Sequence, residues 1–108
     1  MNKYLGILLL TLPTLSYGGG WTEPLTVDTV LTEGATDLIV IQTSGGSQSV
    51  NGCVLNNWIF IADNENRRNR AYSTAMAALA SGKKISLWYG DTCSTWSFHS
   101  ATSIKLLK

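Results

Sequence analysis

Side chains that could act as nucleophile, acid or base are few in this chain. His99 is the only histidine. A serine-histidine-aspartate arrangement would have to combine it with Ser97 or Ser100 and with Asp91, and none of these stands at a diagnostic spacing. A single histidine in a polar segment is typical of a surface position, and one histidine with paired cysteines provides too few ligands for a metal ion. We therefore expect no catalysis, no metal and no cofactor.

The first residues have the pattern of an export signal. Lys3 precedes the apolar run 4–12, which is too short to span a bilayer. The small residues Ser16 and Gly18 precede a cleavage point before Gly19. We expect a signal peptide over residues 1–18, a single domain over residues 19–108, no transmembrane anchor, and a secreted or periplasmic location.

Cys53 and Cys93 are the only cysteines. In an exported chain an even cysteine count favours a disulfide over metal ligation or free thiols. Closing a loop of about 40 residues stabilises a fold by roughly 4 kcal/mol in the chain-entropy description. We predict that the two cysteines are joined.

Basic residues cluster at one place. Arg67, Arg68 and Arg70 suit contact with an anionic group through their planar guanidinium geometry. A solvated face balanced by Asp63 and Glu65 is the alternative, and we favour it, while keeping Arg67 and Arg70 as ligand-binding candidates. Overall the chain has 8 Lys and Arg against 7 Asp and Glu. This near-neutral balance argues against a nucleic-acid partner.

Aromatic residues give a further candidate site. Of the 4 tryptophans, Trp58 and Trp88 lie in apolar or alternating segments and are expected to pack in the fold. Trp96 instead follows Ser94 and Thr95 and precedes Ser97, so its ring is framed by hydroxyls that suit a sugar ring or a flat protein partner. A Trp96 that covers one end of the domain or the disulfide is the open alternative.

Most of the elements that must position these residues are predicted to be strands. Residues 26–33 and 36–43 are rich in β-branched and aliphatic residues, with Gly34-Ala35 as the turn of a hairpin. Residues 52–62 predict a third strand, which Asn56-Asn57 interrupts at the place of a bulge. Residues 84–89 alternate as a strand, Gly90-Asp91 predicts a turn, residues 92–101 predict a loop or short strand, and residues 102–107 predict a last strand.

One helix lies between these groups of strands. The polar run 63–69 supplies an N-cap, and Gly82 suits the left-handed position that ends a helix. Tyr72, Met76 and Leu79 recur at helical spacing among many alanines. We expect Ala75, Met76 and Leu79 to face the sheet.

The order strand-strand-strand-helix-strand-strand predicts a mainly β fold, a β-barrel with one α-helix. It is the order of the oligonucleotide- and oligosaccharide-binding (OB) barrel, although other small α+β folds share it.

Several segments resemble a known family. Gly52-Cys53, the run 70–73, the run 77–85 and Cys93 are similar to the B subunits of subtilase cytotoxin and typhoid toxin, as is the pair Trp21-Thr22. The close similarity covers residues 70–87. The resemblance implies an OB barrel, a five-membered ring, a catalytic A subunit as partner, and binding of sialylated host-cell glycans.

The sequence also departs from those subunits. Glu23-Pro24-Leu25 runs almost directly into the first long strand, so the family's sugar-binding serine has no counterpart here, and the family's additional cysteines are absent. We expect a secreted, non-enzymatic binding protein similar to the glycan-binding B subunits. A secreted or periplasmic protein-interaction domain without a glycan role is the alternative.

Overall fold

The computed structural model describes residues 19–34, 37–47 and 49–108. The predicted signal peptide, Ala35 of the predicted turn, and the first predicted residue of the second strand lie outside the described residues. The elements in chain order are β1 (Gly20–Trp21), β2 (Leu25–Glu33), β3 (Leu38–Ser44), β4 (Val54–Phe60), α2 (Glu65–Ser81), β5 (Lys84–Cys93), a short 3-10 turn (Thr95–Ser97) and β6 (Phe98–Leu106).

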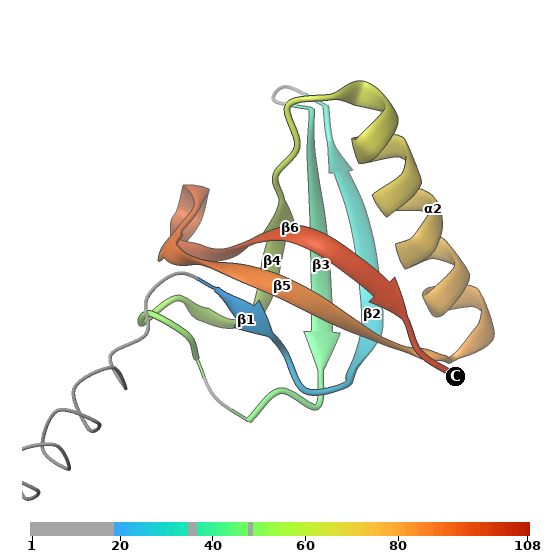
Figure 1. The fold of residues 1–108 in the computed structure, drawn as a ribbon, viewed down its shortest axis with the longest axis horizontal. Coiled ribbons are helices and arrows are strands. Elements are labelled where there is room, and N and C mark those ends of the chain that lie inside the picture. Colours follow the sequence, from blue (N-terminus) through green and yellow to red (C-terminus); the bar gives the residue numbers. More distant parts are fainter. Residues whose placement is uncertain (1–18, 35–36, 48) are drawn as a thin grey trace, which may run out of the picture.

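The strands β2 to β6 form a closed barrel (Figure 1). β2 pairs with β3, and β3 with β4, in antiparallel register. β4 and β6 run parallel, and β5 pairs antiparallel with both β6 and β2, which closes the circle. This five-stranded barrel with one helix is OB-like, so the predicted fold class is confirmed.

The last two strands differ from the sequence-based prediction. Gly90-Asp91 does not form the turn, because β5 continues to Cys93. The chain reverses at residues 94–97 instead, and β6 already begins at Phe98. Register shifts between β5 and β6 on either side of Tyr89 let the long strand bend without ending. The two-residue strand β1, which pairs with Tyr89 and Trp88, was not predicted.

Alanines, not the larger apolar residues, attach the helix to the barrel. Ala71, Ala75 and Ala78 are buried, whereas Met76 is 36% and Leu79 38% exposed. The expectation for Ala75 is confirmed, and the expectation that Met76 and Leu79 face the sheet is wrong. Small side chains let the helix backbone lie close to the strands, which leaves the longer side chains at the margin of the contact.

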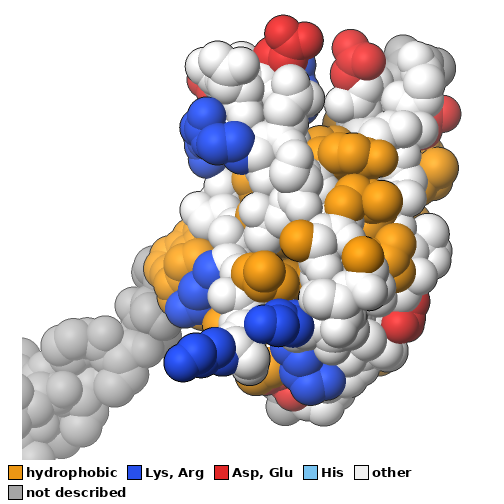
Figure 2. Space-filling model, turned by 90° about the vertical axis from the view of Figure 1, so that its right-hand side faces the viewer, with side chains coloured by type: hydrophobic (Ala, Val, Ile, Leu, Met, Phe, Trp, Pro, Cys, Tyr) orange, Lys and Arg blue, Asp and Glu red, His pale blue; other side chains and the backbone are white. Residues whose placement is uncertain are grey.

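The helix ends are those that the sequence predicts. The Asn64 side chain accepts a hydrogen bond from the N–H of Arg67, and Gly82 closes the helix at φ 75° with its N–H donating to the carbonyl of Ala78. The margin of the helix carries an apolar stripe of Tyr72, Met76 and Leu79, with Leu31 of β2 also exposed. Figure 2, which looks onto this side, shows apolar side chains gathered along it.

The predicted disulfide is present. Cys53, just before β4, is bonded to Cys93 at the end of β5 across 40 residues of sequence, with the two Cα atoms 5.6 Å apart. In the part of the chain that the structure describes, no helix is long and apolar enough to cross a membrane. The disulfide is compatible with an extracellular or periplasmic protein.

Candidate functional site

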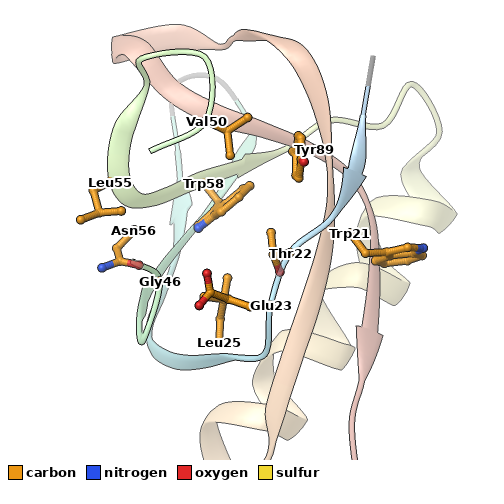
Figure 3. Close-up of a pocket in the computed structure, with 10 residues that line it drawn as sticks. All are labelled: Trp21, Thr22, Glu23, Leu25, Gly46, Val50, Leu55, Asn56, Trp58 and Tyr89. Carbon is orange, nitrogen blue, oxygen red and sulfur yellow. The ribbon is translucent and has the colours of Figure 1, made fainter. Parts of the chain in front are cut away.

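A pocket opens on the barrel wall where β1, the start of β2 and the start of β4 meet (Figure 3). We call it the Trp58 pocket. Its volume is about 160 Å³. Sites for drug-sized ligands are typically about 300–1,000 Å³, so this one suits a single small terminal group. The lining residues are Trp21, Thr22, Glu23, Leu25, Gly46, Val50, Leu55, Asn56, Trp58 and Tyr89.

An irregularity in β4 builds one wall of this pocket. Val54 pairs with Phe98, yet the next pair joins Trp58 to His99, so β4 carries extra residues between the two pairs. Asn56 lies in this excess at φ 64°, in the left-handed region that few residues other than glycine adopt. The predicted interruption at Asn56-Asn57 is therefore confirmed. Unusual backbone of this kind is often found at ligand sites.

Hydrogen bonds fix the orientation of the Asn56 side chain. The indole Nε1–H of Trp58 donates to Thr43 Oγ1 at 3.2 Å, and Thr43 Oγ1 donates to Asn56 Oδ1, also at 3.2 Å. Because an indole nitrogen is a donor only, the threonine hydroxyl must accept from Trp58 and can use its own hydrogen for Asn56. Asn56 Oδ1 keeps a second lone pair with which it can accept from a ligand.

The remaining polar side chains of the pocket are Thr22, Glu23 and Tyr89, and Thr22 Oγ1 already accepts a hydrogen bond from the N–H of Leu87 at 3.1 Å. The Glu23 carboxylate points into the space below Trp58 and accepts a hydrogen bond from Ser47 Oγ at 3.2 Å (Figure 3). The Tyr89 hydroxyl has no hydrogen-bond partner among the described residues. The Trp21 ring points away from the pocket, toward Trp88, whose ring centroid is 5.6 Å away. The pocket thus presents mainly hydrogen-bond acceptors beside aromatic carbon.

His99 supports the pocket from behind. Its ring stacks on Trp58 with centroids 4.3 Å apart. Nε2 accepts from the backbone N–H of Val50 at 2.9 Å, and Nδ1 lies 3.2 Å from the carbonyl oxygen of Asn57. A carbonyl only accepts, so Nδ1 carries the hydrogen and the ring is neutral. Burial lowers the pKa of His99 and outweighs the opposing effect of its backbone contacts.

The expectation of a surface histidine is therefore wrong, since His99 is 1% exposed. Both of its nitrogens are satisfied by the backbone, which is what permits burial. Neither nitrogen contacts Ser97 or Ser100, and the Ser100 hydroxyl donates to the carbonyl of Thr92. Within residues 19–34, 37–47 and 49–108 no group of His, Cys, Asp and Glu is arranged to hold a metal ion.

The Trp96 segment forms a separate exposed tip between β5 and β6. Trp96 is 52% exposed and its ring meets Phe98 edge to face at 5.7 Å. Trp96 and Ser97 both have positive φ, and backbone bonds from Ser97 to Ser94 and from Ser94 to Phe98 shape the tip. Ser94, Thr95 and Ser97 are the neighbours of Trp96 along this tip, and a ligand site there stays a prediction.

The two predicted arginines lie elsewhere. Arg67 and Arg70 line a shallow groove between α2 and β6, where Arg67 Nη2 donates to the carbonyl of Thr102 at 2.8 Å. Arg68 Nη1 donates to the carbonyl of Ala62 at 2.9 Å. Figure 1 places the helix and the tip of the β5–β6 connection at opposite sides of the barrel. The structure therefore does not combine the arginines with Trp96 in one site.

Sequence reasoning missed the Trp58 pocket because its residues come from distant segments. The break at Asn56-Asn57 inside an apolar strand was the one local signal.

The fold and this pocket define an OB-like barrel protein with a small, acceptor-rich surface site. The chain belongs to a family of unknown function, DUF5992, which it matches over residues 4–108. No curated protein matches the sequence.

Proposed function

We propose that this is an exported, non-enzymatic binding protein that recognises a glycan on a cell surface, as the toxin B subunits that it resembles do. The observation that carries this proposal is the Trp58 pocket, with the Glu23 carboxylate, the Asn56 amide oxygen and the Tyr89 phenol around one small cavity. Saccharides present hydroxyl donors on a ring whose C–H faces contact aromatic carbon. A pocket of acceptors beside Trp58 and Tyr89 matches both properties.

The export part of the proposal rests on the sequence of residues 1–18 and on the disulfide. Disulfide bonds such as the one between Cys53 and Cys93 persist in oxidising compartments and are rare in cytosolic proteins. The protein then meets its glycan outside the cytoplasm. Cleavage before Gly19 is checked by intact mass of the exported chain.

Assembly into a ring of identical subunits is part of the same proposal. One small pocket gives weak binding, and repetition of the pocket in a homo-oligomer raises avidity strongly. The exposed stripe of Tyr72, Met76 and Leu79 supports a second copy as the occupant of the helix face. Light scattering should show an oligomer that Met76→Asp disrupts, whereas Ser73→Asp, on the same helix outside the stripe, should not. A monomeric wild type at micromolar concentration contradicts the ring and, with it, an A subunit held at its centre.

The experiment for glycan binding is calorimetric titration of the purified protein with oligosaccharides chosen from a glycan array. Tyr89→Phe removes one hydroxyl and Asn56→Gly removes the amide while suiting the left-handed backbone. Each should weaken binding about 10-fold, the effect of one lost hydrogen bond to a well-ordered ligand. Trp96→Ala, at the tip, is the comparison variant. Loss of binding in Trp96→Ala alone would move the site to the predicted Trp96 segment, and an array without binding would reject the function.

One observation favours a second candidate, a protein-interaction domain without a glycan role. β2 pairs with β5 only at Leu25 and Thr26, so the rest of this strand has one side without a partner strand, near α2 and the exposed Leu31. A partner strand could add there. A blank glycan array, together with a purified partner protein that no longer binds Leu31→Lys, would support this alternative.

A further inference from the structure

The charge of the Trp58 pocket is the feature that limits its ligand. Glu23 is the one ionisable carboxylate among the lining residues, and no Lys, Arg or His lines the cavity. An anionic ligand group in this space would lie beside a carboxylate without a cation to balance either charge. The Glu23 side chain is exposed at this surface, and like charges brought together there reduce affinity.

The backbone before Glu23 is firmly held, so the exposed Glu23 side chain starts from a fixed position beside the pocket. The N–H of Thr22 donates to the carbonyl of Leu87 at 2.9 Å, and the carbonyl of Thr22 accepts from Ser86 Oγ at 2.7 Å. Leu25, two residues beyond Glu23, is 2% exposed. Anchors on both sides of Glu23 fix where its side chain leaves the backbone.

A hydrogen bond also holds the carboxylate itself. Ser47 Oγ donates to Glu23, at 3.2 Å from Oε1 and 3.5 Å from Oε2. One serine hydrogen leaves most of the acceptor capacity of the carboxylate free. Two neighbouring hydroxyls of a sugar ring can donate to it, as pairs of donors do in other carboxylate sites.

Four of the cations engage other surfaces. The Nζ of Lys105 lies 4.2 Å from the centre of the Trp21 ring, which points away from the pocket. The Nζ of Lys84 donates to Thr26 Oγ1 at 2.9 Å. Arg67 and Arg70 line the groove between α2 and β6. None of these four side chains lines the cavity beside Glu23.

We infer that Glu23 is the specificity-determining residue of the pocket and that it selects an uncharged terminal saccharide against a sialylated one. This inference rests on the proposed glycan function and names its ligand class. It differs from the sialylated ligands that the toxin-subunit resemblance implies.

The experiment compares one branched oligosaccharide with and without its terminal sialic acids, by calorimetry on the full mature protein at pH 7.5. We expect the desialylated probe to bind at least 10-fold more tightly. Glu23→Gln keeps the size of the side chain and removes its charge, and it should reduce this ratio to below about 3-fold. Glu65→Gln, which removes a carboxylate from the first turn of α2, should leave the ratio unchanged. Higher salt should reduce the ratio in wild type because it screens the repulsion.

Equal or tighter binding of the sialylated probe by wild type would overturn the inference and leave the glycan function standing. A preference for the desialylated probe that Glu23→Gln retains in full would also overturn it, because another residue would then select. No binding of either probe would reject both the inference and the proposed function.

Discussion

The imidazole of His99 accepts a hydrogen bond at Nε2 from the backbone N–H of Val50, at 2.9 Å, from a position behind the pocket floor. Val50 belongs to the pocket lining, so a buried side chain on β6 holds the segment that borders the site. A proton on Nε2 would replace this acceptor with a second donor and place a charge in the core.

This contact predicts a loss of stability in mild acid. The pKa of His99 is lowered in the folded state from an ordinary value of 6.5. Below pH 6.5 His99 is therefore protonated in the unfolded chain while it is still neutral in the folded chain. Stability is full above pH 6.5 and decreases as the pH falls from there toward the folded pKa. Chemical unfolding at pH 7.5 and 5.5 measures the change. Because His99 is the only histidine, His99→Gln should flatten the profile in this window, and an equal slope in that variant would contradict the assignment.

The disulfide should supply a large share of the stability. Cys53→Ala with Cys93→Ala should lower the free energy of unfolding by about 2–5 kcal/mol, because the unfolded chain regains the freedom of a long loop. Calorimetric melting of this double variant, and of wild type with reductant, checks it. Identical melting temperatures with and without reductant would be incompatible with this role.

The docking face of the helix can be tested with two adjacent residues. Ala75→Asp buries an unpaired charge at a site that is 0% exposed and should destabilise by about 3 kcal/mol or more. Met76→Asp introduces the same residue at a site that is 36% exposed and should change the stability of the subunit by about 1 kcal/mol at most. Urea unfolding of both variants decides, and the reverse ranking would show that the helix packs through its other stripe.

The chain of hydrogen bonds from Trp58 through Thr43 to Asn56 should matter for both stability and binding. Thr43→Val keeps the shape but leaves the buried indole N–H of Trp58 without its acceptor, at a cost of about 1–3 kcal/mol. It also frees the Asn56 amide, so saccharide affinity should fall further than stability alone explains. Thr29→Val, an exposed change on β2, is the control. A Thr43→Val protein with wild-type unfolding midpoint and affinity would exclude this role.

Much of the fold could be predicted because local pattern and tertiary structure agree. The strand segments, the capped helix and the cysteine pair each carry their own signal, and their order predicted the barrel. The face of the helix could not be assigned in the same way, because positions 71, 75 and 78 and positions 72, 76 and 79 both follow helical spacing. Which of the two sets faces the barrel depends on how closely the backbone of the helix approaches the strands. The spacing of apolar residues in the sequence does not determine that distance.

The site was less predictable because it is made by tertiary contacts. Glu23, Asn56 and Tyr89 are far apart in sequence and meet only through the β2–β5 closure and the excess residues in β4. The polar residues next to His99 in the sequence favoured an exposed position. In the fold its two ring nitrogens bond to backbone groups of Val50 and Asn57, and these bonds make burial of the ring favourable. Trp96 carried a visible local signal, and the structure places it at an exposed tip instead of the pocket.

Nuclear magnetic resonance titration of the isotope-labelled protein with the desialylated oligosaccharide tests the central claim most directly, since it locates binding residue by residue. We predict saturable shifts of the Trp58 indole N–H, the Asn56 side-chain amide, and the backbone amides of Glu23 and Tyr89, with small changes at Trp96 and Arg70. Shifts confined to residues 94–97 or to the groove of Arg67 and Arg70, or no shifts at millimolar saccharide, would contradict a glycan site in the Trp58 pocket.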